Sequence, residues 1–208
     1  MNQKQNIILV GATLFAFMLG CGQRKETIKT DVSNSPTPTV AKTPSEEEKI
    51  RDFVNKSKDL CKFETKEKLD SKAKIKGKIA VVDDFGLNSC RLDGFDSSNK
   101  PLGIETFGIK KENLALSTGE IDTLIKVKCE EGSQIGVYTY PGYPDTPAYA
   151  KECEVTVSDY KNFVTFGKKN FVGRMLEKNV NVSRSTGKVI AAEPYEQIGK
   201  YLTSLQAK

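Results

Sequence analysis

A pair of aspartates stands out among the residues of this 208-residue chain that could do chemistry. The segment IAVVDD, residues 79–84, reads as a buried strand that ends in Asp83 and Asp84. Carboxylates placed together at a strand end can hold a divalent cation or act as general acid and base. They are equally typical of a strand that leads into a turn, and the following residues, DDFGLN, have turn composition. We favour the turn.

The same segment, KIAVVDD, resembles the first strand of a response-regulator receiver, in which the acids hold Mg²⁺. A receiver also needs a phosphoacceptor aspartate after a later parallel strand, together with a Ser or Thr and a Lys. The segments downstream have an antiparallel pattern instead. We therefore expect no metal and no cofactor here.

Other catalytic patterns are also missing from the sequence. The chain has no histidine, which excludes Ser-His and Cys-His catalysis and histidine-ligated metals. Gly103 and Gly108 have the spacing of a phosphate-binding loop, but Ile109 stands where its lysine should be. A hydrolase that uses carboxylates or a Ser-Lys pair stays open as the alternative function. No catalytic residue can be assigned.

The most distinctive stretch of the folded region is VYTYPGYPDTPAYA, residues 137–150. Its prolines favour an extended loop, and tyrosines offer broad amphipathic contact area at low entropic cost. The stretch is a possible recognition loop for a protein, a peptide or a glycan. Local packing of the tyrosines on their own domain is the other interpretation. The tyrosines concerned are Tyr138, Tyr140, Tyr143 and Tyr149.

The first 21 residues read as an export signal that ends in a cysteine. Lys4 precedes an apolar run, residues 7–19, which is too short for a comfortable membrane span. Met18-Leu19-Gly20-Cys21 closes the run and resembles the lipobox of bacterial lipoproteins. This resemblance implies cleavage between Gly20 and Cys21 and a diacylglycerol on the Cys21 thiol. An uncleaved N-terminal anchor is the alternative.

Four further cysteines in an exported chain suggest two disulfides. The segments TLIKVKC (123–129) and ECEVTVS (152–158) both alternate apolar and polar residues. An antiparallel pairing with Cys129 opposite Cys153 aligns apolar with apolar side chains and Lys128 with Glu154. We therefore prefer Cys129–Cys153 and Cys61–Cys90, although in a plain meander the strand expected at 135–140 would separate the first pair. Four free thiols or a zinc site remain the alternatives.

Composition divides the chain into three parts. Residues 1–20 are the signal peptide, and residues 21–43, which contain SPTPT, have the composition of a flexible tether. Residues 44–208 are expected to form one globular domain. The lysine-rich run at 62–78 is typical of the solvent face of a strand, and contact with anionic lipid headgroups is its alternative role. A net charge of +5, with both signs mixed, predicts no nucleic-acid partner.

The predicted elements give an α+β fold, mainly an antiparallel sheet with an N-terminal and a C-terminal helix packed on it. Ser45 and Glu48 have the spacing of a capping box at the start of the first helix. A strand is expected over residues 73–84, and a weak strand near 102–109. The remaining predictions are strands at 123–129, 135–140, 152–158 and 163–172 and a turn at 159–162. A C-terminal helix is also expected, with Pro194 at its first position and an apolar face of Tyr195, Ile198, Leu202 and Leu205.

The expected function is that of a lipid-anchored cell-envelope protein. Its globular part resembles small lipoprotein domains that carry no assigned activity. We expect a non-enzymatic binding or assembly module whose partners are the membrane, through the lipid, and an envelope protein, peptide or glycan. Gly22 differs from the aspartate that retains some lipoproteins in the inner membrane, which favours the periplasmic side of the outer membrane.

Overall fold

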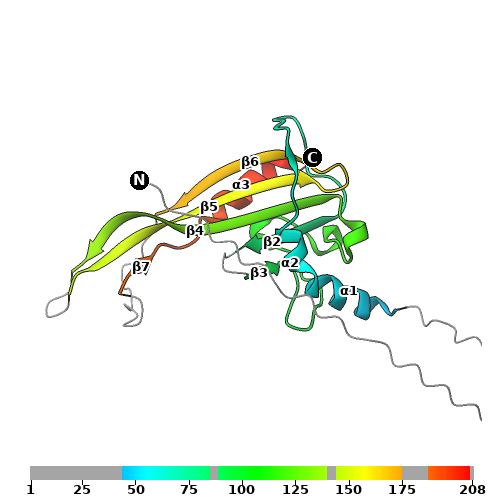
Figure 1. Ribbon diagram of the computed structural model, residues 1–208, viewed down its shortest axis with the longest axis horizontal. Helices are drawn as coiled ribbons and strands as arrows, with labels where there is room; N and C mark the ends of the chain where they lie inside the picture. Colours follow the sequence, from blue (N-terminus) through cyan, green and yellow to red (C-terminus); the bar gives the residue numbers. More distant parts are fainter. Residues whose placement is uncertain (1–43, 85–88, 140–143, 175–186, 207–208) are drawn as a thin grey trace, which may run out of the picture. The chain divides into compact units, whose positions relative to one another are not determined.

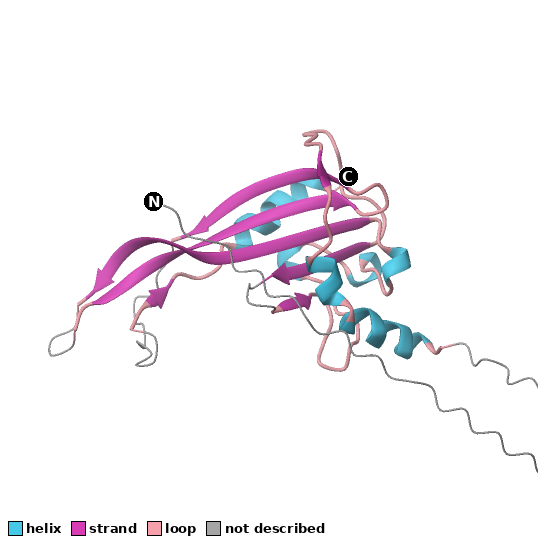
Figure 2. Ribbon diagram, viewed as in Figure 1, coloured by secondary structure: helices cyan, strands magenta, loops and turns pink. Residues whose placement is uncertain are grey.

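The computed structural model describes residues 44–84, 89–139, 144–174 and 187–206 (Figure 1). They lie in the compact unit Lys42–Lys208 and form an α+β fold with a seven-stranded, mostly antiparallel sheet (Figure 2). This is the predicted fold class. The predicted signal peptide, Cys21 and the predicted tether lie outside the described residues.

The sheet has the strand order β1-β6-β5-β4-β2-β3, and β7 pairs with β5. The strands are β1 (Lys66–Glu67), β2 (Ile79–Asp84), β3 (Cys90–Leu92), β4 (Thr123–Tyr138), β5 (Thr146–Asp159), β6 (Val164–Gly173) and β7 (Val189–Ile190). The helices are α1 (Glu46–Asn55), α2 (Ser57–Cys61) and α3 (Tyr195–Leu205), with short 3-10 turns η1 (Glu105–Phe107), η2 (Lys111–Asn113) and η3 (Thr118–Glu120). Among the described residues, no helix has the length and apolar character needed to cross a membrane.

The first helix begins as its sequence predicts. Ser45 caps α1, its side chain accepts a hydrogen bond from the Glu48 amide, and the Glu48 carboxylate accepts one from the Ser45 amide. The helix buries Ile50 and Phe53. After a break at Lys56, α2 continues to Cys61, where the first disulfide is formed.

The strand predicted over 73–84 begins only at Ile79. The prediction is therefore wrong for residues 73–78. Gly77 has a φ of +58°, outside the extended region, and turns the chain just before β2. The strand itself lies between β4 and β3 and is buried, as expected for an interior strand. It runs parallel to β4, because the intervening segment crosses over through 3-10 turns. The weak strand expected near 102–109 is absent from the described residues, where η1 and a single bridge between Ile104 and Ile109 are found.

The two strands predicted at 123–129 and 135–140 are one strand, β4, with register shifts between Glu131 and Gly136. The obstacle to pairing Cys129 with Cys153 is therefore removed. These cysteines lie directly opposite each other, and Lys128 lies opposite Glu154, as predicted. Beyond the end of β6, β4 and β5 continue together as a two-stranded arm beside β7 (Figure 1).

Apolar side chains fill both sides of the sheet. On one side, α3 and η1 cover a cluster that includes Val81, Ile125 and Val155. On the other side, Phe53 of α1 and Leu60 of α2 belong to a second cluster. The disulfides divide in the same way: Cys129–Cys153 lies in the first cluster, and Cys61 and Cys90 pack against the second.

The C-terminal helix follows Pro194, which lies one residue before the helix instead of at its first position. Ile198 and Leu202 are fully buried on the predicted apolar face. The helix packs closely on η1 at Gly199, where a Cβ atom would lie 2.0 Å from the carbonyl oxygen of Thr106. A glycine is therefore required at this contact.

Candidate functional site

A cleft of about 830 Å³ lies where β2 and β4 begin and β5 turns into β6. Residues 68–77 form one wall, and residues from the starts of β4 and β6 and from the β5–β6 turn form the rest. Five lysines and three aspartates line it. We call this feature the lysine cleft; its charged residues are Lys68, Asp70, Lys72, Lys74, Lys76, Asp122, Asp159 and Lys161.

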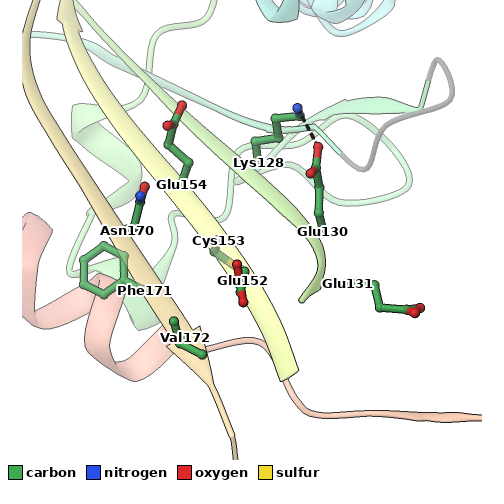
Figure 3. Close-up of a pocket in the computed structure, with 9 residues that line it drawn as sticks. All are labelled: Lys128, Glu130, Glu131, Glu152, Cys153, Glu154, Asn170, Phe171 and Val172. Carbon is green, nitrogen blue, oxygen red and sulfur yellow. Dashed lines mark ion pairs between the residues drawn. The ribbon is translucent and has the colours of Figure 1, made fainter. Parts of the chain in front are cut away.

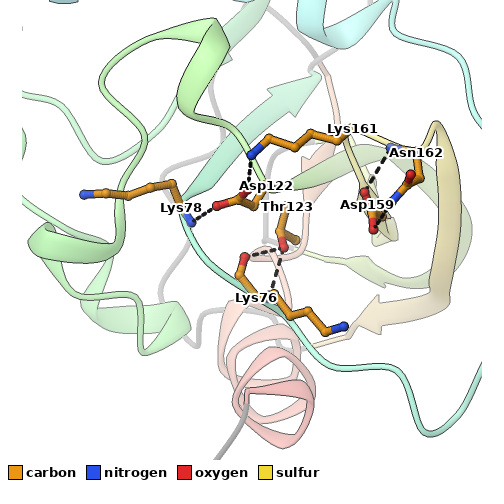
Figure 4. A network of polar contacts seen from close by, with 7 residues as sticks. All are labelled: Lys76, Lys78, Asp122, Thr123, Asp159, Lys161 and Asn162. Carbon is orange, nitrogen blue, oxygen red and sulfur yellow. Dashed lines mark hydrogen bonds and ion pairs between the residues drawn. The ribbon is translucent and has the colours of Figure 1, made fainter.

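Asp122 is the centre of the polar network beside the cleft (Figure 4). One carboxylate oxygen lies 2.5 Å from the Lys161 ammonium, and the other accepts a hydrogen bond of 2.9 Å from the Lys78 amide. These two donors hold the pKa of Asp122 below its usual value. Next to it, the Thr123 hydroxyl donates to the Lys76 carbonyl at 2.8 Å and accepts from the Lys76 amide at 3.2 Å. Together Asp122 and Thr123 fix the lysine-bearing segment to the start of β4.

The turn on the opposite wall is fixed by its own side chains. Asp159 accepts hydrogen bonds from the amide and the side-chain amide of Asn162, at 3.0 and 2.8 Å. Phe163 completes the turn with a φ of +56°. The turn predicted at 159–162 is thus confirmed, and its aspartate is occupied by local donors.

A second polar surface covers the outer side of β4, β5 and β6 (Figure 3). Lys128 lies 2.6 Å from Glu130, and Lys168 lies 3.0 and 3.3 Å from Glu67 and Glu154. The nearby cavity is about 240 Å³. Lys128 holds the pKa of Glu130 below its usual value. Glu67, Glu130 and Glu154 are therefore each paired with a lysine on this face.

Lys126 is the lysine best placed to test a Ser-Lys mechanism. Burial lowers the pKa of this half-buried side chain, yet its ammonium donates to the carbonyl oxygens of Cys61 and Phe63. The buried Ser158 hydroxyl bonds to Thr165 instead, at 2.8 Å. Within the described residues, the hydroxyl and the amine therefore have other partners.

The aspartate pair of the IAVVDD segment is separated by the sheet. Neighbours on a strand point to opposite faces. Asp83 accordingly lies on the α3 side, where it influences Tyr195, whereas Asp84 lines a polar groove with Lys126. Among the described residues, no cluster of three or more acidic or cysteine side chains is suited to a metal ion.

Asp83 instead pairs with Asp93, a contact that was not predicted. Asp83 is only 3% exposed, and burial, followed by hydrogen bonding to Asp93, raises its pKa to about 7. Arg91 bridges the two, with distances of 3.7 Å to Asp83 and 3.0 Å to Asp93. Burial and the nearby Asp83 charge raise the pKa of Tyr195 to about 12. Neither aspartate lines a cleft described above, so the pair is a feature of packing between β2, β3 and α3.

The structure brings together some of the predicted site residues. Both disulfides are present, Cys61–Cys90 and Cys129–Cys153, with Cα–Cα distances of 6.2 and 4.0 Å. Tyr138 and Tyr149 are half-buried on the β4–β5 arm, while Tyr140 and Tyr143 lie outside the described residues, as do Gly20 and Cys21.

The lysine cleft was not predicted as a site. The sequence predicts that the lysine run at 62–78 is the solvent face of a strand, with contact with anionic lipid headgroups as the alternative, and the strand expected over 73–84 begins only at Ile79. Asp122 and Lys161 carried no sequence signal that related them to this run, because they join it only through the folding of distant segments.

Comparisons with family models, with curated proteins and with solved structures found no match to this chain. Its function therefore has to be inferred from its own residues and their arrangement.

Proposed function

We propose that the chain is a lipid-anchored binding or assembly module of a bacterial cell envelope. The observation that carries this proposal is the pair of disulfides, one on each side of the sheet. Structural disulfides persist in oxidising compartments outside the cytoplasm. The Met18–Cys21 segment supplies the matching export signal and the acceptor for the lipid, and Gly22 favours the periplasmic side of the outer membrane.

The β4–β5 arm supports a binding role. Its strands extend past β6 and leave Val137 52% exposed, while Ile190 of the adjoining β7 is 42% exposed. Tyr149 of β5 pairs with Ile190 and lies on the same face of the arm as Val137, whereas Tyr138 of β4 lies on the opposite face. Exposed aliphatic side chains next to half-buried tyrosines are typical of surfaces that bind proteins or peptides. We assign recognition to this arm.

The lipid anchor is tested by comparing the wild-type chain with Cys21→Ser in a bacterial host that is fed labelled palmitate. Wild type and a tether control, Ser35→Ala, should carry the label, lose residues 1–20 and fractionate with membranes. Cys21→Ser should carry no label and keep its N-terminus. An unmodified Cys21 thiol in the purified wild-type protein would contradict the proposal.

Recognition by the arm is tested separately by placing a photo-crosslinking residue at Val137 in living cells. A discrete adduct is expected there and none at the exposed control position Glu112, which lies in η2. Absence of an adduct at Val137, Tyr138 and Tyr149 alike would show that the arm does not contact a partner.

A further inference from the structure

We infer that the lysine cleft is a docking surface for anionic phospholipid headgroups of the membrane that holds the chain. This inference rests on the proposed lipid anchor at Cys21. It assigns an orientation to the anchored domain, with the β5–β6 turn and residues 68–77 directed towards the bilayer.

The aspartates of the cleft already accept hydrogen bonds from groups of the chain, whereas some of its lysines can bind an external anion. Asp122 is occupied by Lys161 and the Lys78 amide, and Asp159 by Asn162. Asp70 accepts a hydrogen bond from the Lys72 amide. By contrast, three lysines of the cleft have no carboxylate of the described residues within 4 Å of their ammonium groups. They are Lys68, Lys72 and Lys76. These three ammonium groups are exposed, and within the described part of the chain no carboxylate competes with an external anion for them.

The backbone that carries these lysines is fixed by hydrogen bonds to the start of β4 and to the end of α3. Thr123 bonds to both backbone groups of Lys76, and the Lys74 ammonium donates to the Ser204 carbonyl oxygen at 2.8 Å. Ile75 forms a backbone bond to Leu205 at the end of α3. Binding an anion therefore requires little further ordering of the backbone, which favours binding.

The same segment carries an exposed apolar side chain. Leu69 is 60% exposed between Lys68 and Asp70, and Phe163 of the facing turn is 56% exposed. An apolar side chain among lysines suits the boundary between headgroups and acyl chains, where the lysines meet phosphates and the apolar group enters the bilayer. A soluble phosphate ligand would not need the apolar groups.

The chain between the lipid and the domain is long enough for this orientation. Residues 22–43 can span roughly 70 Å when fully extended, at about 3.3 Å per residue. The 16-residue strand β4 measures about 55 Å by the rise of a strand. The tether can therefore bring either end of the sheet to the membrane surface, so the charges and apolar groups decide which end docks.

The test uses the absence of tryptophan from the chain. The variant Leu69→Trp puts a single indole at an exposed position between Lys68 and Asp70, which line the cleft. Leu102→Trp, at a position that is 65% exposed outside the cleft, is its matched control. The full acylated chain is reconstituted into vesicles of phosphatidylcholine or of phosphatidylcholine with an equal part of phosphatidylglycerol. Indole emission and its quenching by brominated lipid are then measured.

We expect a blue shift and quenching for Leu69→Trp in the phosphatidylglycerol vesicles, reversed by high salt, and neither for Leu102→Trp. Replacing the three lysines Lys68, Lys72 and Lys76 with glutamine should abolish the response. Each lysine contributes about fivefold to attraction by an anionic surface, so the loss amounts to about a hundredfold. The control replacement of Lys58, Lys100 and Lys110 should leave the response in place.

Equal indole environments in the two kinds of vesicle would overturn the inference. So would the same spectral change on adding pyrophosphate to phosphatidylcholine vesicles, because the cleft would then take a free phosphate compound. Failure of the lipid anchor would look different. The chain would not float with phosphatidylcholine vesicles at all, whereas the response of Leu69→Trp to phosphatidylglycerol could still be measured on the unanchored chain.

Discussion

Asp83→Asn should flatten the dependence of stability on pH. The replacement keeps the size of a side chain that is 3% exposed and removes its ability to ionise. Asp83 faces Asp93 and Arg91, with Glu193 and Tyr195 contributing to the field around it. The amide of the variant can still donate to Asp93, so the hydrogen bond between positions 83 and 93 survives.

The magnitude follows from the pKa of Asp83, which rises from 3.8 to about 7. The native state therefore binds this proton more tightly than the unfolded chain. The stabilisation is fully present below pH 3.8 and is lost as the pH rises through about 7. A difference of about three pKa units corresponds to about 4 kcal/mol at most, at about 1.4 kcal/mol per unit. Near neutral pH the Asp83→Asn variant should thus be more stable than the wild-type chain.

Urea unfolding at intervals between pH 4 and 8, with the disulfides intact, measures this free energy. The wild-type stability should fall across this range relative to Asp83→Asn. Arg91→Gln removes the positive charge that lowers the pKa of Asp83, so it should steepen the fall. Parallel pH profiles for the wild-type chain and Asp83→Asn would refute the reasoning, because ionisation of this buried group would then carry no folding cost.

Three further changes test the fold. Gly77→Ala should lower the unfolding free energy by at least about 2 kcal/mol in urea titrations. The reason is that φ at this position is +58° and the new Cβ would lie 1.9 Å from Asp122 Oδ2. An unchanged urea midpoint would contradict this prediction. Replacing Cys129 and Cys153 together with alanine should cost about 3 kcal/mol by the same assay, since the bridge closes a loop of 24 residues. A stability within error of wild type would show that the bridge is dispensable. Ser45→Ala should weaken α1 by about 1 kcal/mol, seen as faster amide exchange in its first turn, and unaltered exchange would argue against the cap.

Local and short-range features were the ones that the sequence predicted well. The capping box needs two side chains three residues apart, and the buried face of α3 needs only helical spacing. The Cys129–Cys153 register was predictable because alternating residues on two strands allow one alignment that satisfies both apolar and charged pairs. Export and acylation of Cys21 stay predictions from the sequence, since those residues lie outside the described structure.

Features that depend on distant segments were not predictable from local patterns. Periodicity could not show that residues 123–138 form one strand, because the register shifts interrupt the alternation. It also could not show that β2 starts at Ile79, because the backbone of Lys76 and Lys78 is bound by side chains more than 40 residues later in the chain.

The sequence by itself thus determined the helix start, the strand faces and the cysteine pairing, each of which depends on residue types at short or alternating spacing. Only the tertiary structure decided that a run of lysines lines a cleft and that Asp83 is buried against Asp93. Both are consequences of which segments the sheet brings side by side, and the free energy of a charge depends on those neighbours and on its access to water.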